Sequence, residues 1–291
     1  MLGEFWVQRL ILFFIFLSLA VVLGFGGNYY NKKIEAKGKE SYIAYKKTLQ
    51  QEELEKKKET QAKLERLNPK TNKNQSVVDF LHFNALMKER VAISVIGSSV
   101  AKGDGASSVS KAWPSLVESK IRGANEDLGK IAIKNHGESG WTTQDIVDRD
   151  IVSAVVKDYP ALVLIETSLL HNHGKSFSMD VTKANLNEIA SSLKEALPNA
   201  RLVFFSASPS PEKLKEANAR GYRYEDYIRN TEELIKQNGW EYFDMNEGIQ
   251  KYLDDTGGKF KDMLNGDGVL MNDEGQRIWA EVLFGYMSLA K

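Results

Sequence analysis

The chain has 291 residues, with 39 basic and 39 acidic side chains and therefore no formal net charge. The charges are unevenly distributed. Residues 31–75 hold 13 Lys and Arg against 7 Asp and Glu, and residues 76–291 hold 25 against 31. An acidic region of this size argues against nucleic-acid binding. The chain has no cysteine, which excludes disulfides, thiolate metal sites and a cysteine nucleophile.

An uncharged apolar run of 18 residues, LILFFIFLSLAVVLGFGG, covers residues 10–27. This length is near the lower limit for a membrane-spanning helix. Tyr29 and Tyr30 follow it, as aromatic side chains do at a membrane interface. A cleaved signal peptide is the alternative, but no clear small-x-small cleavage site follows the run. We predict an uncleaved membrane anchor over residues 1–30.

The basic residues around the apolar run leave its orientation open. Arg9 is the only basic side chain before the run, and six lysines follow it within residues 32–47. Taken literally, the positive-inside rule places the C-terminal region in the cytoplasm. Lysines that lie along anionic lipid headgroups would satisfy the same pattern without fixing the orientation.

Residues 31–75 are rich in Lys, Glu, Gln and Leu, with few apolar positions. Strong helix formers with this little apolar surface predict a solvated helical stalk. No heptad repeat is sustained, so a coiled coil is not predicted. Asn68 and Pro69 end the helix, and a short polar linker follows.

From residue 76 the composition is that of a globular domain, in which apolar strands alternate with helices. This alternation predicts a three-layer α/β/α domain over residues 76–291, with a mainly parallel five-stranded sheet. The predicted strands are 91–96, 130–134, 161–166, 201–206 and 241–244, and the predicted helices are 77–88, 113–121, 143–156, 181–197, 224–237 and 273–289.

Four polar loops are expected at one edge of this sheet, where ligands bind in open α/β folds. The first follows strand 91–96 and contains Gly97, Ser98 and Ser99, a turn that can present a hydroxyl and a backbone N–H to one substrate atom. The other three cover residues 135–143, 166–174 and 265–273. Glycines in the second loop leave backbone N–H groups able to point at an anion, as an oxyanion hole requires.

Over roughly residues 90–290 the chain resembles the SGNH (GDSL-type) hydrolase family. The Gly-Asp-Ser-x-x-x-Gly block of the family matches residues 97–103, GSSVAKG, with Ser98 in the place of the aspartate. This resemblance implies that Ser99 is the nucleophile. The Ser-Gly-x-Thr context of the second block matches residues 139–142 and implies that Gly140 and Ser99 donate N–H groups to the oxyanion.

The third family block, usually Gly-x-Asn-Asp, is distorted in this chain. Its asparagine donor falls at His171 or Asn172, and spacing alone does not decide between them. Trp141, which follows the second-block glycine, is a candidate sugar-stacking surface.

The fourth block departs furthest from the family pattern. The family has Asp-x-x-His, in which the histidine is the general base and the aspartate orients it. Here Asp267 is kept, and Leu270 stands where the histidine is expected. Because leucine cannot accept a proton, the serine loses its expected activator.

Another histidine is an alternative source of the missing base. The chain has four histidines, and three of them, His136, His171 and His173, fall in the predicted edge loops. His82 precedes the first strand and is expected to be a surface or packing residue. One of these histidines, with His171 as the candidate, could replace the missing general base. The alternative for each is an ordinary loop histidine that is solvated or locally hydrogen-bonded.

The resemblance implies ester hydrolysis through an acyl intermediate on Ser99, without a cofactor. Together with the predicted anchor and stalk, it suggests the hypothesis of a membrane-anchored serine esterase or deacetylase that acts outside the cell on O-acyl groups of a cell-surface glycan. The alternative is a catalytically degenerate relative that binds a glycan or a partner protein without turnover. Nucleotide binding has little support, because no phosphate-binding loop is present. No metal site is predicted, because the paired His171 and His173 have no matching carboxylate cluster.

Overall fold

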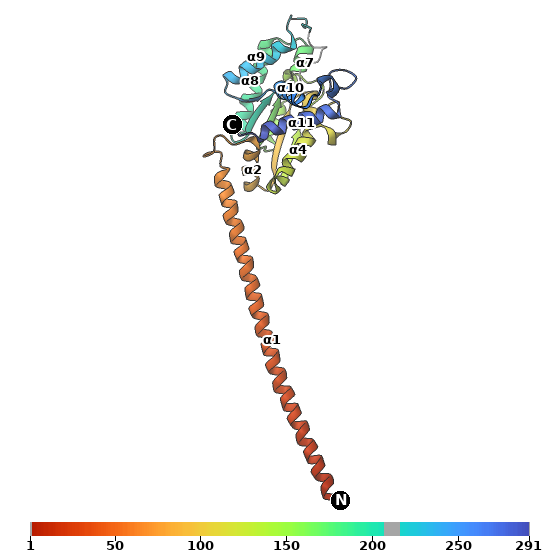
Figure 1. The fold of residues 1–291 in the computed structure, drawn as a ribbon. Coiled ribbons are helices and arrows are strands. Elements are labelled where there is room, and N and C mark those ends of the chain that lie inside the picture. The colour runs from red at the N-terminus through yellow and green to blue at the C-terminus, as the bar shows by residue number, and fades with distance from the viewer. Residues whose placement is uncertain (1, 207–215, 291) are drawn as a thin grey trace. The chain divides into compact units, whose positions relative to one another are not determined.

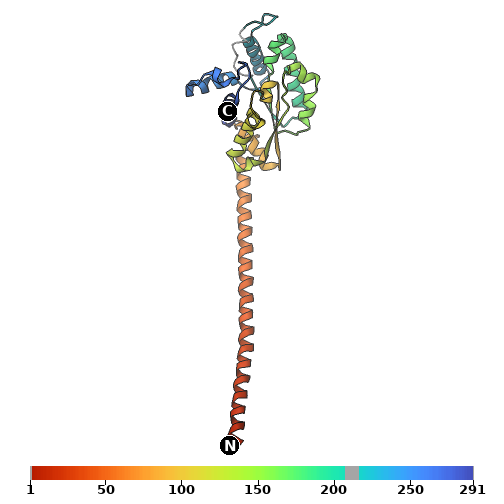
Figure 2. The same ribbon diagram turned by 90° about the vertical axis from the view of Figure 1, so that its right-hand side faces the viewer.

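The computed structural model describes the backbone of residues 2–206 and 216–290, and the side chains of residues 10–206 and 216–290. The chain divides into two compact units, residues 1–63 and 64–291. The N-terminal unit is helical, and the C-terminal unit holds a sheet with helices on both faces (Figures 1 and 2).

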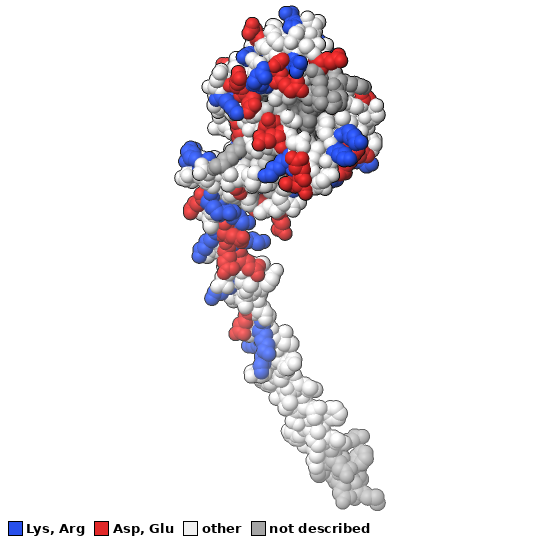
Figure 3. All heavy atoms as spheres, turned by 45° about the horizontal axis from the view of Figure 1, so that its top comes forward, with Lys and Arg blue, Asp and Glu red and all other residues white. Residues whose placement is uncertain are grey.

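A single helix, α1 (Leu2–Arg66), contains both the predicted anchor and most of the predicted stalk. No break in the helix marks residue 30, where we placed the boundary between them. The N-terminal part of α1 exposes apolar side chains without charge, and the part that follows exposes both basic and acidic side chains (Figure 3). Glu-to-Lys pairs at i, i+4, such as Glu53–Lys57 at 2.7 Å, favour the helix in this charged part.

By length and composition, α1 is long and apolar enough from Leu10 onward to cross a membrane. An N-terminal signal sequence satisfies the same criterion.

The predicted five-stranded parallel sheet is confirmed. Its order is β2-β1-β3-β4-β5, with every neighbouring pair parallel. The strands are β1 (Val91–Ile96), β2 (Ile131–Asn135), β3 (Leu162–Glu166), β4 (Arg201–Phe205) and β5 (Glu241–Phe243).

Side chains that alternate along the central strands build two separate apolar cores. In β3, Leu162 and Leu164 join one core, whereas Val163 and Ile165 join the other. This period of two follows from strand geometry and buries both faces of the sheet. Helices α2 (Val77–Met87), α4 (Trp113–Ala124), α10 (Met245–Thr256) and α11 (Asp273–Ser288) supply the first core, and α5 (Thr143–Asp148) and α6 (Ile151–Val156) supply the second. Helices α8 (Met179–Ala196) and α9 (Tyr224–Gln237) contribute to both.

The predicted helix 143–156 is instead two helices, α5 and α6. The break is at Asp150, which adopts a left-handed conformation (φ 50°) and accepts a hydrogen bond from Ser153 N at 3.3 Å. Short helices were also missed within the edge loops: α3 (Ser99–Lys102) and α7 (Leu169–Gly174). The described residues also form the 3₁₀ helices η1 (Val109–Lys111), η2 (Glu126–Lys130) and η4 (Phe260–Met263).

An aromatic cluster in the first core supports helix α3. Trp113 packs against Phe205 and Trp279, with ring centroids 5.7 and 6.3 Å away. Its indole N–H donates to Val100 O at 2.7 Å. The buried Gln276 accepts from Trp113 N and donates to Asp104 O. The turn of chain that begins at Ser99 is therefore fixed from below by the core.

Candidate active site

Strand β1 ends in a tight turn that places Ser99 at the start of α3. Gly97 has φ +149°, a conformation that L side chains rarely adopt. Helix α3 ends at Gly103, which is left-handed (φ 83°), and the N–H groups of Gly103 and Asp104 donate back to Ser99 O. Ser99 is thereby held on a single closed helical turn, and only 4% of its surface is exposed.

The structure brings Ser99 and His171 together. Ser99 Oγ and His171 Nε2 are 2.8 Å apart and form a hydrogen bond. His171 lies on α7, which follows the carboxyl end of β3, the neighbour of β1 in the sheet. A hydroxyl and an imidazole nitrogen at this distance have the geometry required for transfer of the serine proton.

The surroundings of His171 favour the neutral imidazole. Burial lowers the pKa of His171, and the charge of Lys175 lowers it further, whereas Asp104 and Asp145 act in the opposite direction. Within residues 10–206 and 216–290, no carboxylate forms a hydrogen bond with the second ring nitrogen of His171. The described arrangement is thus a pair of side chains, not a hydrogen-bonded triad.

The second edge loop lies directly against α3. Glu138 N donates to Gly97 O at 3.2 Å, and Lys102 Nζ donates to Glu138 Oε1 and Ser139 Oγ. A Cβ at Gly137 would lie 2.5 Å from Lys102 N, so the close approach of the two backbones needs glycine there.

Gly140 follows in the same loop, and its position requires glycine because of the backbone conformation and not because of a close contact. Its φ is +78°, yet a Cβ there would meet nothing within 4 Å. Among the hydrogen bonds of the described residues, none uses the N–H of Gly140 or of Ser99. Both donors that the family resemblance assigns to the oxyanion are therefore available in this structure.

Asn172 is committed to the protein interior. Its Oδ1 accepts from Thr143 N at 3.0 Å, and its Nδ2 donates to Thr143 Oγ1 and Thr182 Oγ1. The side chain is fully buried. Of the two candidates for the third-block donor, His171 contacts Ser99, whereas Asn172 joins the second loop to α8.

Trp141 is half-buried at the margin of the second core. The guanidinium of Arg149 lies over its ring, 5.4 Å from the centroid. The indole therefore has one face engaged in a cation–π contact, and stacking on a sugar would have to use the other.

The loop with Asp267 and Leu270 folds back on itself. Asp267 Oδ1 accepts from Val269 N at 2.8 Å and from Leu270 N at 3.0 Å, and Asn265 N donates to Leu270 O. Asn265 Nδ2 also donates to Gly105 O, so this loop lies beside the turn that follows α3. The charges of Asp104 and Asp145 raise the pKa of His171.

The other three histidines have structural contacts. His82 Nε2 pairs with Asp127 Oδ2 at 2.8 Å and joins α2 to η2. His136 Nε2 pairs with Asp158 Oδ2 at 2.6 Å. His173 is buried and packs edge-on against the rings of Tyr224 and Tyr227.

A buried carboxyl group next to the site was not singled out from the sequence. Glu166, the last residue of β3, is fully buried and accepts hydrogen bonds from Ser98 and Ser168. The one available signal was an acidic residue at the end of an otherwise apolar strand. Ser98, in the place of the family aspartate, uses its hydroxyl in this contact.

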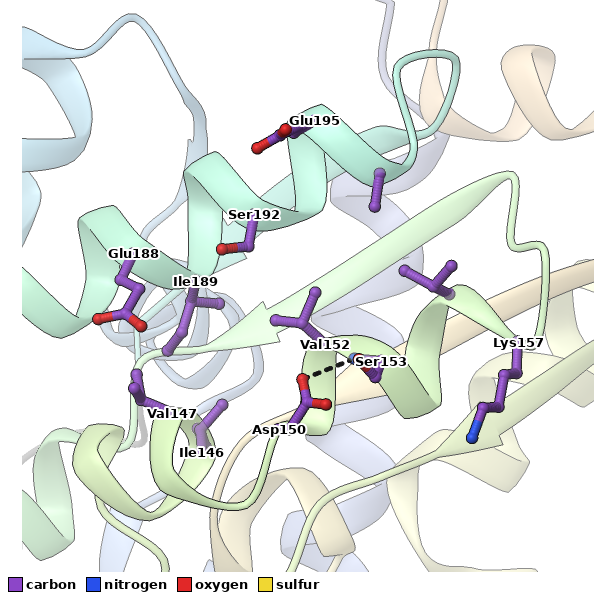
Figure 4. A pocket seen from close by; sticks show the side chains of 12 residues that line it. Ile146, Val147, Asp150, Val152, Ser153, Lys157, Glu188, Ile189, Ser192 and Glu195 are labelled. Carbon is purple, nitrogen blue, oxygen red and sulfur yellow. Dashed lines mark hydrogen bonds between the residues drawn. The ribbon is translucent and has the colours of Figure 1, made fainter.

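A separate hollow lies between α5, α6 and α8 (Figure 4). Apolar side chains such as Ile146, Val152 and Ile189 line it together with Glu188 and Glu195. None of the residues that line it belongs to the Ser99 or His171 turns. In the described part of the chain, no group of three or more His, Cys, Asp or Glu is arranged to hold a metal ion.

The sheet topology defines the class of fold, a three-layer α/β/α protein, and the site at its edge contains a serine–histidine contact. Residues 95–278 match the model of the GDSL-like lipase/acylhydrolase family, and the chain belongs to this family. No curated protein matches the chain.

Solved structures of the family have the same fold. A lipase/acylhydrolase from Enterococcus faecalis is 16% identical, with a TM-score of 0.55, and the match covers 68% of this chain and 95% of that one. The psychrotrophic esterase EstA from Pseudoalteromonas sp. is 18% identical, with a TM-score of 0.52, and the match covers 67% of this chain and 96% of that one. A mutant of an acetyl-xylooligosaccharide esterase from Geobacillus Stearmophilus is 17% identical, with a TM-score of 0.53, and the match covers 70% of this chain and 97% of that one.

Proposed function

We propose that this protein is a membrane-anchored serine esterase that removes O-acyl groups from a cell-surface glycan, with Ser99 as nucleophile and His171 as general base. The observation that carries the proposal is the 2.8 Å contact between Ser99 Oγ and His171 Nε2. Membership of the GDSL-like lipase/acylhydrolase family supports ester chemistry.

In the proposed reaction, His171 Nε2 takes the proton of Ser99 while Oγ attacks the ester carbonyl carbon. The N–H groups of Ser99 and Gly140 stabilise the oxyanion that forms. The alcohol leaves with the proton from His171, and an acyl-serine remains. A water molecule activated by the same imidazole then hydrolyses this intermediate and restores Ser99.

The glycan as substrate has weaker support than the ester chemistry. One solved relative is described as an acetyl-xylooligosaccharide esterase. Helix α3, which begins at Ser99, ends at Lys102, and the contact of Lys102 with Glu138 gives this edge polar groups that suit a hydroxyl-rich substrate better than a lipid. The exposed part of the half-buried Trp141 side chain is the proposed contact for a sugar ring.

The proposed location is the outer face of a membrane, with α1 as an uncleaved anchor. The length and apolar composition of α1 support the anchor. Protease treatment of intact cells tests the orientation. Degradation of the C-terminal domain is expected, and protection until the cells are lysed would contradict an external location.

Labelling with a fluorophosphonate probe tests the central claim, because the probe needs an activated serine. The full-length protein in detergent is expected to be labelled and to hydrolyse p-nitrophenyl acetate and an O-acetylated polysaccharide. The Ser99→Ala variant should show neither reaction, with a loss of at least about 10³-fold in kcat.

The specific observation that favours a degenerate protein is Leu270 in the place of the family histidine. A wild-type protein labelled no more than Ser99→Ala, but able to bind a glycan saturably, would establish that second function and refute the first.

A further inference from the structure

The carboxylate of Glu166 receives three hydrogen bonds from two separate turns. Ser98 N and Ser98 Oγ both donate to Oε2 at 2.7 Å, and Ser168 N donates to Oε1 at 2.7 Å. The side chain has no exposed surface. Hydrogen bonds to a buried charged group are short and strong, and leaving such a group without its partners is costly.

These two turns begin the helices that carry the serine and the imidazole. Ser98 is the N-cap residue of α3, directly before Ser99. Ser168 is the N-cap residue of α7, three positions before His171. A single carboxyl group therefore joins the start of one helix to the start of the other.

Both turns also have backbone conformations that need support. Ser168 is left-handed, with φ 53° and ψ 23°, which is unfavourable for a residue with a side chain. At Gly97, a Cβ would lie 2.6 Å from Glu166 Oε2, so the absence of a side chain makes room for the carboxylate. The carboxylate of Glu166 thus occupies the space that a side chain at position 97 would need.

We propose that Glu166 is a positioning residue, a buried carboxylate that sets the separation of Ser99 Oγ and His171 Nε2 by holding the Ser98 and Ser168 turns. The inference rests on the proposed serine–histidine chemistry. Burial raises the pKa of the Glu166 carboxyl, and the hydrogen bonds from Ser98 and Ser168 act against that shift. Because Glu166 has no exposed surface, its proposed role is exerted through the two turns.

Kinetics of Glu166→Gln in the full-length protein test this role. Glutamine keeps the size but puts an NH₂ group where the carboxylate accepted a hydrogen bond, so one of the two turns must shift. We expect kcat and the rate constant of fluorophosphonate inactivation to fall about 10- to 100-fold, because a misplacement of about 1 Å costs on that order. KM should change less than about threefold, since binding is not the step affected.

Two serine variants on and beside β1 provide a matched comparison. Ser98→Ala removes one of the three hydrogen bonds to Glu166, and a smaller fall in kcat than for Glu166→Gln is expected. Ser94→Ala removes an equally buried hydroxyl, which donates to Asp158 Oδ2 at 2.9 Å. This control should lose stability but keep the wild-type kcat.

Wild-type kcat and inactivation rate in folded Glu166→Gln would overturn the proposal. The proposal would also be overturned if Ser94→Ala lost as much kcat as Glu166→Gln at the same thermal stability, because this would indicate a general structural effect. If Glu166→Gln does not fold, the kcat values of Ser98→Ala and Ser94→Ala are compared. A fall in kcat for Ser98→Ala alone supports the proposal, and equal kcat values refute it.

A crystal structure of the variant separates this proposal from the proposed function. If the wild-type protein is unreactive, the proposed function fails, but the distance from Ser99 Oγ to His171 Nε2 still reports on positioning. A longer distance in Glu166→Gln than in the wild type supports the role of Glu166, and an unchanged distance refutes it.

Discussion

Two segments at the carboxyl edge of the sheet, 166–174 and 265–272, contain the kinds of residue that a serine hydrolase uses, and they are built differently. In the first, α7 carries His171 to Ser99. In the second, Asp267 accepts hydrogen bonds from the next backbone N–H groups of its own turn. The comparison teaches that a candidate general base is identified by the atom that it reaches, and its place in a family motif is a secondary guide.

Removal of the imidazole tests this comparison with the largest expected effect. His171→Ala should lower kcat by about 10³-fold or more, because loss of the base in a serine hydrolase costs several orders of magnitude. Hydrolysis of p-nitrophenyl acetate by the purified protein measures it. His136→Ala is the control, since that ring pairs with Asp158, and it should retain most of the activity.

Transfer of the base to the other segment would reverse the comparison. In the His171→Ala background, Leu270→His should raise kcat about 10-fold or more above the single variant. Asp267, which now bonds to Leu270 N, is nearby to orient the new ring. No gain over His171→Ala would show that the 265–272 segment has lost the required geometry.

The pH dependence of kcat/KM sharpens the assignment. The base must be neutral, so activity should rise with pH through the pKa of His171 and then level off. Burial lowers this pKa, so the midpoint of the acidic limb should lie below the ordinary value of 6.5. Below the midpoint, the rate should fall about tenfold per pH unit. A midpoint above 6.5 would indicate a different base or an orienting carboxylate.

The smallest effect is expected at Asp267. Asp267→Asn keeps the size and the Oδ1 that accepts from Val269 N and Leu270 N, so kcat should change less than about threefold. Thermal unfolding should show a loss of at most about 1 kcal/mol, the usual contribution of one such hydrogen bond. A loss of kcat comparable to that of His171→Ala would restore Asp267 to the catalytic role implied by the family pattern.

The fold could be predicted because its signals are local and repeated. The apolar strands such as Val91–Ile96 and Leu162–Glu166 are flanked by polar turns and alternate with helices, which defines a parallel sheet. The single helix predicted over 143–156 was wrong because the left-handed Asp150 has no clear signature in the sequence. Short helices such as α3 and α7 have too few residues to show a period.

The site could be predicted only as far as chain position determines it. Ser99 and Gly140 follow strands and match family blocks, so their placement at one edge followed from topology. Spacing alone did not separate His171 from Asn172, because helix α7 turns one toward Ser99 and the other into the interior. The role of Glu166 depends on two turns separated by about 70 residues, a contact that no local pattern contains.

The near-complete enclosure of Ser99, with 4% of its surface open, has a consequence for what the protein accepts. Any reagent or acyl group that reacts with the hydroxyl must reach it through this small exposed surface. If Ser99 is the nucleophile of the proposed function, compact acyl groups are therefore expected to react faster than bulky ones.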